Sequence, residues 1–330
     1  MSKLEIKGLI RGESNNDYHN NAAVSSSKLK VFMTNPLSYQ RRYITRETGP
    51  QETTVAMSIG SLAHAYILER GTFFDRHMVL PKTYTNDKGE TKPWSGNATV
   101  CKEIIAAAEA AGKEVLTEEE FKAVKALSVA VDANPVAQIL LAGGEAELTW
   151  RVDYENFSVQ SRTDYFVGSA TEEQSVALQA YGIDLQAGEP YIVDLKTTAD
   201  LSSWERTNYG SALVKYGYHL QTGFYRPVVN TVLRDAGIRE VEKFFFVVID
   251  KGLEDSCVFV LDDETMLFST DIIEKAVGKL QQCYATNAWP GYKDRGVVKI
   301  GVPEHIRRAV LMQDVEGQDI PKQDWLTRDE

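Results

Sequence analysis

The chain has 330 residues, of which 43% are apolar and 25% charged, so it is long enough for one large domain or two ordinary ones. No apolar run approaches the roughly 20 residues that a membrane-spanning helix needs, so we expect no such helix. Residues 1–17 lack the hydrophobic stretch of a signal peptide. The three cysteines lie far apart and cannot all pair, and they fit neither a disulfide framework nor a zinc or iron–sulfur site: Cys101, Cys257 and Cys283. We therefore expect a cytoplasmic, reducing environment and no membrane partner.

The net charge of −11 argues against bulk attraction to nucleic acid, because non-specific binding comes from lysine and arginine neutralising phosphates. A nucleic-acid enzyme with this charge needs a local basic surface, a metal ion, or both. One segment contains five cations and no acid: Lys28, Lys30, Arg41, Arg42 and Arg46. This basic segment is the best candidate for phosphate contact, although a solvated helix face would have the same composition.

The N-terminal part of the chain is expected to start with an arm and two helices. Residues 1–20 are polar and rich in asparagine, which predicts an irregular arm. Ser25-Ser26-Ser27 offers N-caps for a helix, and Asn35-Pro36 ends it because a residue before proline disfavours the helical region. The run 57–69 is apolar nearly all round and predicts a buried helix.

Polar and helical patterns follow. Residues 81–97 predict a loop with a turn at Asp87-Lys88-Gly89. The alanine-rich stretch 99–111 predicts a helix, and Thr117 with Glu120 forms a capping box that opens another. Asn134-Pro135 begins a short helix that Gly143-Gly144 stops.

The second half of the chain changes to strand patterns. A hairpin is predicted from 146–152 and 157–168, followed after a long connection over 168–190 by a strand at 191–197. Two helices are predicted at 213–234 (kinked at Pro227) and at roughly 264–285. Two further strands are predicted between them, at 241–250 and 256–262. This order predicts an α/β fold with a mixed sheet and helices on both faces.

The domain organisation follows from these elements. We expect an N-terminal arm (1–20), one domain (21–295) with a helical part (21–145) and a sheet core (146–295), and an acidic C-terminal extension (296–330). The extension contains six acids, which favour a disordered, solvated tail over one that recruits a protein partner or shields the basic entrance when DNA is absent: Asp314, Glu316, Asp319, Asp324, Asp329 and Glu330.

The candidate site centres on Asp194-Leu195-Lys196, at the end of a buried strand. An acid and a lysine two residues apart on a strand lie on the same face, as they must to hold a metal ion and a polarised water side by side. Asp-x-Lys is expected about once by chance in a chain of this length, so its context decides its meaning. Val193 and Leu195 are apolar, and an acid buried beside them needs a partner or a metal.

Further polar groups recur on the neighbouring elements. His64 lies on the apolar helix, where a core histidine is the more frequent reading, with Gly60 one turn earlier. Asp164 shares its strand face with Arg162, and Glu147 on the preceding strand is placed by antiparallel pairing near the same face; a surface salt bridge and an exposed acid are the alternatives. One helical turn separates Gln221 from Tyr225 on a helix that alternatively faces solvent.

Taken in order, these groups resemble the PD-(D/E)XK nuclease superfamily and its RecB-like branch. That branch carries Gly-x-x-x-His on a helix, an acid on a strand, Asp-x-Lys on the next strand and Gln-x-x-x-Tyr on the following helix. The matching positions are Gly60…His64, Asp164, Asp194…Lys196 and Gln221…Tyr225. Within the branch, the N-terminal serine helix, the Asn35-Pro36 stop and the later Trp289-Pro290-Gly291-Tyr292 look most like the RecE (exonuclease VIII) nuclease domain of phage and prophage recombination systems.

The resemblance covers roughly residues 20–295 and has departures. Thr163 stands where the motif's name places a proline, and the cysteines of iron–sulfur members are absent. The implied fold is the restriction-endonuclease-like mixed sheet with a helical N-terminal region.

The resemblance also implies a mechanism of metal-assisted phosphodiester hydrolysis with Mg²⁺, for which Mn²⁺ could substitute. Asp164 and Asp194 would be the central ligands, completed by His64 and the backbone carbonyl of Leu195, with Glu147 supporting them or a second ion. Lys196 would orient or activate the attacking water, and Gln221 and Tyr225 would position the scissile strand or Lys196. Lys28, Lys30, Arg41, Arg42, Arg46 and Arg162 would contact DNA.

The implied substrate is the end of double-stranded DNA, resected 5′ to 3′ to leave 3′ overhangs for recombination by strand annealing in a bacterial cell. The implied partners are a RecT-like single-strand annealing protein and further copies of the chain in a ring, trimer or tetramer. Two rival interpretations remain: a RecB-like endonuclease that cuts branched or flapped DNA, and a non-catalytic DNA-end or protein-binding module on a nuclease fold. The intact Asp164, Asp194 and Lys196 set argues against the second.

Overall fold

A computed structural model of the protein describes residues 6–47, 55–206, 210–302, 304 and 306–308. The chain forms two compact units, Met1–Trp289 and Pro290–Glu330. In the second unit the structure describes a short 3₁₀ turn at Tyr292–Arg295 and helical residues at 304 and 306–308, and the six acids of the tail lie outside the described residues. No helix in the described part of the chain is both long and apolar enough to span a membrane.

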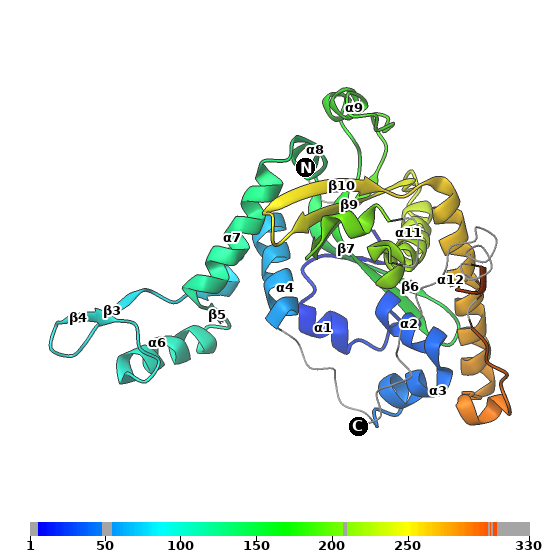
Figure 1. The fold of residues 1–330 in the computed structure, drawn as a ribbon, viewed down its shortest axis with the longest axis horizontal. Coiled ribbons are helices and arrows are strands. Elements are labelled where there is room, and N and C mark those ends of the chain that lie inside the picture. The colour runs from blue at the N-terminus through cyan, green and yellow to red at the C-terminus, as the bar shows by residue number, and fades with distance from the viewer. Residues whose placement is uncertain (1–5, 48–54, 207–209, 303, 305, 309–330) are drawn as a thin grey trace, which may run out of the picture. The chain divides into compact units, whose positions relative to one another are not determined.

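A mixed sheet forms the centre of the first unit (Figure 1). Six described strands pair in the order β1 (Leu9–Ile10), β6 (Glu145–Asp153), β7 (Ser158–Val167), β8 (Tyr191–Thr198), β9 (Lys243–Asp250) and β10 (Asp255–Val260). Strands β8 and β9 are parallel and the other neighbours are antiparallel. The predicted hairpin and the three later strands are therefore confirmed.

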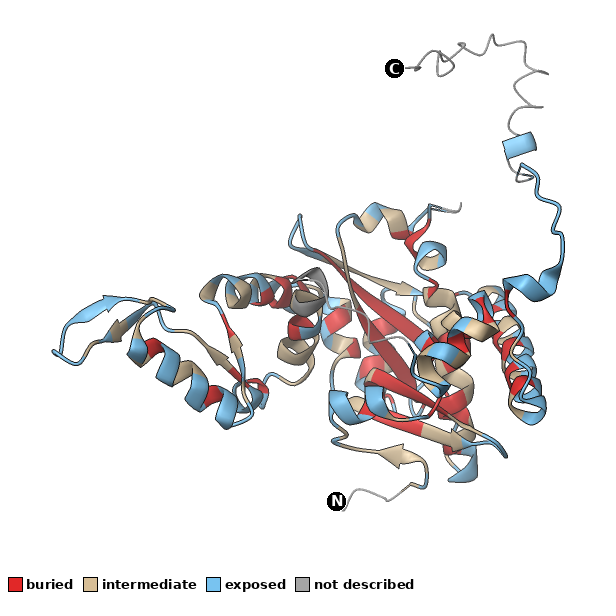
Figure 2. Cartoon of the chain, turned by 90° about the horizontal axis from the view of Figure 1, so that it is seen from below, coloured by how far each residue is buried: buried red, intermediate tan, exposed pale blue. Residues whose placement is uncertain are grey.

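Helices cover both faces of this sheet, as predicted. On one face, α2 (Ser26–Thr34), α11 (Tyr218–Asp235) and α12 (Asp263–Thr286) pack against a core that includes Trp150, Phe244 and Phe246. On the other face, α4 (Val55–Leu68), α7 (Glu118–Asp132) and α8 (Pro135–Leu140) share a core with alternate residues of the same strands, such as Phe245 and Val247. Burial on both faces explains why β9 reads as a continuous apolar run (Figure 2).

A smaller lobe extends from the sheet at α7 (Figure 1). It contains α5 (Phe73–Arg76), the parallel pair β2 (His77–Val79) and β5 (Glu114–Leu116), the hairpin β3 (Thr83–Thr85) with β4 (Thr91–Pro93), and α6 (Thr99–Ala110). The sequence predicted only a loop over 81–97. The hairpin was missed because its strands are three residues long and mostly exposed, so they show no alternation.

Further differences concern short elements. The arm predicted to be irregular contains β1 and α1 (Asn15–Asn20), whose N-cap is Ser14. The long connection after β7 contains α9 (Glu172–Gln179), which was not predicted. The helix begins with a capping box at Thr171 that is visible in the sequence. Of residues 59–68 in α4 only Leu62 and Ala63 are buried, so this apolar helix is not enclosed as predicted. The remaining short helical elements are α3 (Pro36–Tyr39), a π turn (Gln40–Ile44), a 3₁₀ turn (Leu201–Trp204) and α10 (Ala212–Lys215).

Candidate metal centre

The two central acids lie where strands β7 and β8 separate. The two strands pair only at Tyr165–Val193, Phe166–Ile192 and Val167–Tyr191. Asp164 and Asp194 are the next residues on each strand, just past the last pair. In place of a ladder hydrogen bond, the Leu195 N–H donates to Asp164 Oδ2 at 2.8 Å. This fork leaves an opening in the sheet with one carboxylate on each side, because neither strand closes it with backbone pairing.

Glu147 joins the fork from β6 through an unusual backbone. Its φ of +52° lies in the left-handed region, which a glutamate rarely adopts and which costs roughly 1–3 kcal/mol. The ladder with β7 has Ala146–Tyr165 and Leu148–Thr163 on either side, and Glu147 is skipped opposite Asp164. Strain of this kind is often concentrated at functional sites, and here it coincides with a glutamate beside another acid.

His64 completes a group of three potential ligands from helix α4. Its Nδ1 lies 3.3 Å from Asp164 Oδ2, and its ring donates a hydrogen bond to the backbone carbonyl of Leu195, the carbonyl that was predicted as a metal ligand. One ligand atom each from His64, Glu147 and Asp164 can be chosen so that all three lie within 4.8 Å of one another. A Cβ on Gly60 would make only an ordinary 3.6 Å contact with Thr197 Oγ1, so α4 runs close beside the end of β8.

Asp194 lies at the other side of the fork and is fully buried. Its Oδ1 accepts a hydrogen bond from Gln221 Nε2 at 2.5 Å. Its Oδ2 contacts the Lys196 ammonium in an ion pair and has no further hydrogen bond among the described residues. Tyr225, one turn along α11, packs with its ring 6.4 Å from Phe244, and its hydroxyl has no hydrogen-bond partner in the described part of the chain. The structure thus brings Gln221 into contact with Asp194 and places Tyr225 within electrostatic reach of the fork, where burial, and then the charges of Tyr18 and the three acids, raises the pKa of its hydroxyl.

The pKa values at the fork are shifted because charge is buried there. Burial, and then the charge of Asp164, raises the pKa of Glu147 to about 8 and that of Asp194 to about 6. Burial likewise raises the pKa of Asp164, although Lys196 opposes it, and burial lowers the pKa of His64 to about 4. Burial alone would lower the pKa of Lys196, but Asp194 and Asp164 outweigh it and raise that pKa.

These residues fit a divalent metal ion. Three acids share one lysine, and His64 is uncharged near neutral pH. The pKa of each acid is raised, to about 8 for Glu147, because burial disfavours the charged forms, so the fork holds protons that a bound cation would displace. The Asp194 Oδ2 atom also lacks a full set of partners. Carboxylate oxygens with one imidazole are ligands that Mg²⁺ or Mn²⁺ accepts, and a cation would balance the charge. His64, Glu147 and Asp164 are positioned to bind it directly, and Asp194 borders them.

Comparison with known proteins shows the family and the fold of the chain. Residues 25–296 match the model of a family described as a PDDEXK-like domain of unknown function (DUF3799). The chain belongs to this family. A crystal structure from Eubacterium rectale, provisionally described as an exonuclease, is similar in fold with a TM-score of 0.51 and 14% identity, covering 94% of this chain and 100% of that one. No curated protein matches the sequence significantly. The PDDEXK-like fold predicted from the motif order is therefore confirmed.

The predicted DNA-contacting cations of this PDDEXK-like chain divide into buried and exposed groups. Lys28 is buried, and its ammonium donates to the carbonyls of Asn21 and Ala23, so it stabilises the loop before α2 and does not face a ligand. Lys30 donates to the Tyr216 carbonyl at 3.1 Å. The exposed cations are Arg41 and Arg46, with Arg42 half-buried beside the Tyr43 ring. The structure thus removes Lys28 from the predicted phosphate-contacting surface and leaves Lys30, Arg41, Arg42 and Arg46 accessible.

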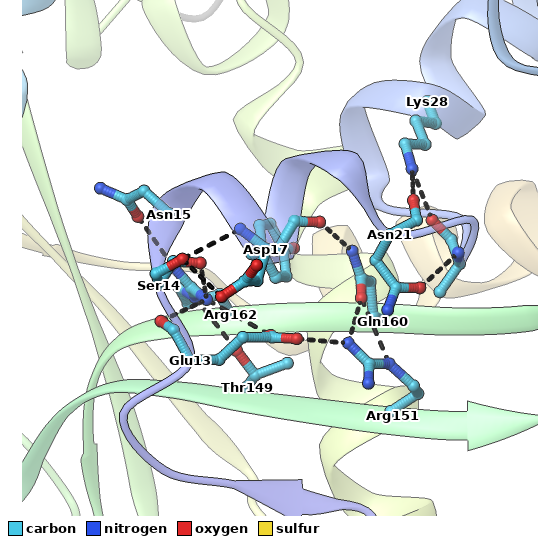
Figure 3. Close-up of polar contacts among 12 residues, drawn as sticks. Glu13, Ser14, Asn15, Asp17, Asn21, Lys28, Thr149, Arg151, Gln160 and Arg162 are labelled. Carbon is cyan, nitrogen blue, oxygen red and sulfur yellow. Dashed lines mark hydrogen bonds and ion pairs between the residues drawn. The ribbon is translucent and has the colours of Figure 1, made fainter.

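Arg162 was also predicted to contact DNA, and the structure contradicts this. Its side chain is buried, donates to Asn15 Oδ1 at 2.7 Å and to Thr149 Oγ1 at 3.1 Å, and lies 3.4 Å from Glu13 Oε2 (Figure 3). The guanidinium also covers the Tyr18 ring at 4.2 Å. All its donors face the protein, so Arg162 binds the N-terminal arm to the sheet.

Glu13 is the residue in this region that sequence reasoning missed. It accepts from Arg151 at 2.9 Å while approaching Arg162, and Gln160 also accepts from Arg151 (Figure 3). No local pattern could have indicated it, because Glu13 and Arg162 are 149 positions apart. Arg162 Nη1 also lies 4.0 Å from Glu147, which links the arm to the fork. A cavity of about 630 Å³ borders both, lined among others by Glu13, Glu147, Arg162, Glu69 and Arg76.

Proposed function

We propose that the protein is a divalent-metal-dependent deoxyribonuclease that hydrolyses duplex DNA from its ends. The observation that carries the proposal is the fork, where Asp164, Asp194 and Lys196 meet in a buried, acid-rich opening of the sheet. A metal ion held there by His64, Glu147 and Asp164, with Asp194 beside them, would polarise a phosphate and lower the pKa of a bound water. Membership of a PDDEXK-like family supports this chemistry.

The residues of the chain have distinct tasks in this proposal. Lys196 is protonated at neutral pH because its pKa is raised, so it donates a hydrogen bond to the attacking water or to the negatively charged transition state and does not act as a base. Gln221 holds Asp194 through Oδ1, which leaves Oδ2 directed at Lys196. The Leu195 N–H holds Asp164 in the same way from the backbone.

The finer proposal is a 5′-to-3′ exonuclease of the RecE type that leaves 3′ overhangs for strand annealing. It is supported by the four-part motif order and by the fold neighbour from Eubacterium rectale that is provisionally described as an exonuclease. The proposal extends by resemblance to Mg²⁺ as the physiological ion, a ring-like oligomer and a RecT-like annealing partner in a bacterial cell.

Digestion of matched DNA substrates tests this function. Linear duplex with a 5′ or 3′ label should be degraded with Mg²⁺, the 5′ label being released first, while covalently closed circular duplex of the same sequence stays intact. Asp194→Asn should reduce the rate at least about 100-fold, since it removes a buried charge from the reacting centre, and excess EDTA should abolish it. Asp255→Asn, an exposed strand-end acid, is the control. Cutting of the circle would instead indicate an endonuclease, and full activity in EDTA would contradict the proposal.

A further inference from the structure

An exposed tyrosine lies at the turn between helices α10 and α11, next to the fork. Tyr216 is 54% exposed, and Gly217 after it has a φ of +65°, a left-handed conformation that glycine adopts without strain. The turn directs Tyr216 outward while Tyr218, two residues on, points back toward the sheet core. Single exposed tyrosines are common, and Tyr216 is distinguished by its position beside the fork, next to Tyr218 and the Lys196 ammonium.

The rings around Tyr216 lead from the surface to the site. Its ring centroid is 5.7 Å from that of Tyr218, which stacks on Trp204 at 5.1 Å and an interplanar angle of 11°. The Lys196 ammonium lies 5.2 Å from the centre of the Tyr218 ring. A planar group resting on Tyr216 would therefore be one ring away from the lysine of the fork.

Two further lysines border the same tyrosine. The Lys215 ammonium lies 5.3 Å from the centre of the Tyr216 ring, and Lys30 reaches over from α2 to the Tyr216 carbonyl. Burial, and then the charge of Lys196, lowers the pKa of Lys30, which places these two ammonium groups within electrostatic reach of each other. The path from Tyr216 to the fork is thus lined by three cations in a chain whose net charge is −11.

We propose that Tyr216, Lys215 and Lys30 form a docking site for single-stranded DNA, in which a base stacks on Tyr216 and the adjoining phosphates contact the two lysines. Aromatic rings combined with cations are what single strands require, because every base has a stacking face and every nucleotide a phosphate. The strand so held would continue to Lys196. The inference rests on the proposed function for the identity of the polymer, and it adds that the nucleotides nearest the fork are unpaired when bound.

Fluorescence of 2-aminopurine tests the stacking directly and without cleavage. A short oligonucleotide carrying 2-aminopurine is titrated with protein in EDTA, so that binding is measured apart from catalysis. Wild-type protein and Tyr216→Phe should quench the fluorophore, whereas Tyr216→Ala should lose the quenching and bind about tenfold more weakly, the usual effect of removing one stacking ring. Tyr181→Ala is the matched control, because Tyr181 is 53% exposed and lies after α9, on another part of the surface.

The outcomes separate this inference from the proposed function. Unchanged affinity and quenching in Tyr216→Ala would overturn the docking site even if the wild type degrades DNA. Equal losses in Tyr216→Phe and Tyr216→Ala would also overturn it, because stacking does not need the hydroxyl. The same dependence on Tyr216 with blunt duplex would refute the preference for single strands. Quenching that depends on Tyr216 in a protein without nuclease activity would support the docking site and refute the proposed function.

Discussion

Two clusters of buried charge lie on neighbouring parts of the sheet. They differ in the ratio of acidic to basic side chains. In the arm cluster (Glu13, Arg151 and Arg162) the glutamate contacts both arginines, and Asn15, Thr149 and Gln160 occupy further donors. In the fork cluster (His64, Glu147, Asp164, Asp194 and Lys196) three acids share one lysine.

The pKa shifts express this difference. Burial alone would raise the pKa of Glu13, but Arg151 and Thr149 outweigh it, and the pKa is lowered. Glu147 is only 4.0 Å from Arg162, yet burial and the neighbouring Asp164 raise its pKa to about 8. In the arm cluster one glutamate and several neutral oxygens accept from the two arginines, which stabilises the fold, whereas the fork gathers three acids around one lysine and is suited to bind a cation. The comparison assigns a structural role to the first and a binding role to the second.

Removal of Glu13 should have the largest effect on stability. Glu13→Ala leaves the Arg151 and Arg162 guanidinium groups without their carboxylate, and breaking a buried pair from one side typically costs about 3–5 kcal/mol. Urea denaturation measures this loss of unfolding free energy. Glu155→Ala, in the exposed turn between β6 and β7, is the control and should cost little. A loss below about 1 kcal/mol for Glu13→Ala would show that the arm cluster is not structural.

Neutralising Asp164 should separate metal binding from folding. Asp164→Asn removes one acid from the crowded fork, so the metal-free variant should melt at a higher temperature than the wild type. The wild type should gain about 2.7 kcal/mol from Mg²⁺ or Mn²⁺ at 100 times the Kd, and the variant should lose most of this gain. Thermal denaturation with and without metal measures both, with Asp271→Asn on the exposed face of α12 as control. A lower metal-free Tm in Asp164→Asn would mean that the fork, too, is a balanced structural cluster.

The pH dependence of stability should distinguish the clusters in the wild type. Glu147 and Asp194 have raised pKa values, about 8 and about 6, so the folded protein binds protons that the unfolded chain has released. Without metal, stability should therefore increase as the pH falls from about 8.5 to about 6.5. Below that range the lowered pKa of His64 opposes the trend, because the unfolded histidine gains a proton first. Melting curves in EDTA measure the slope; Glu147→Gln should flatten it above pH 7, and an equal slope in that variant would contradict the assignment.

The sequence predicted those site residues that lie close together on one strand or one helix. Asp194 and Lys196 share a strand face, and Gln221 begins a helix after that strand, so their spacing and order were enough to expect them together. The buried apolar strands were visible for the same reason, since alternation and continuous runs are local properties.

The arm cluster was not predictable, because it depends on backbone geometry and on contacts distant in sequence. Arg162 and Asp164 alternate along β7 and were expected to act on one face, but the skipped pair at Glu147 and the covering arm give them different partners. Nothing near Glu13 in the sequence indicates that it would meet Arg151 and Arg162. The prediction that Arg162 contacts DNA was therefore wrong, although its predicted position next to the site was right.

Glu147 lies close to both clusters, so distances alone do not assign it to one of them. Substitution of Glu147 distinguishes the two assignments, and its expected effect is the smallest of those predicted here. If it acts at the fork, Glu147→Gln lowers metal affinity about tenfold, the lower end of what removing a supporting ligand costs, and leaves the unfolding free energy of the metal-free protein equal or higher. If it mainly serves as a partner of Arg162, the same variant loses stability with no change in metal affinity. Isothermal titration with Mn²⁺ and urea denaturation of the same samples separate the two. The positive φ favours the first result, because a strained glutamate backbone is retained at a cost that a 4.0 Å ion pair alone does not offset.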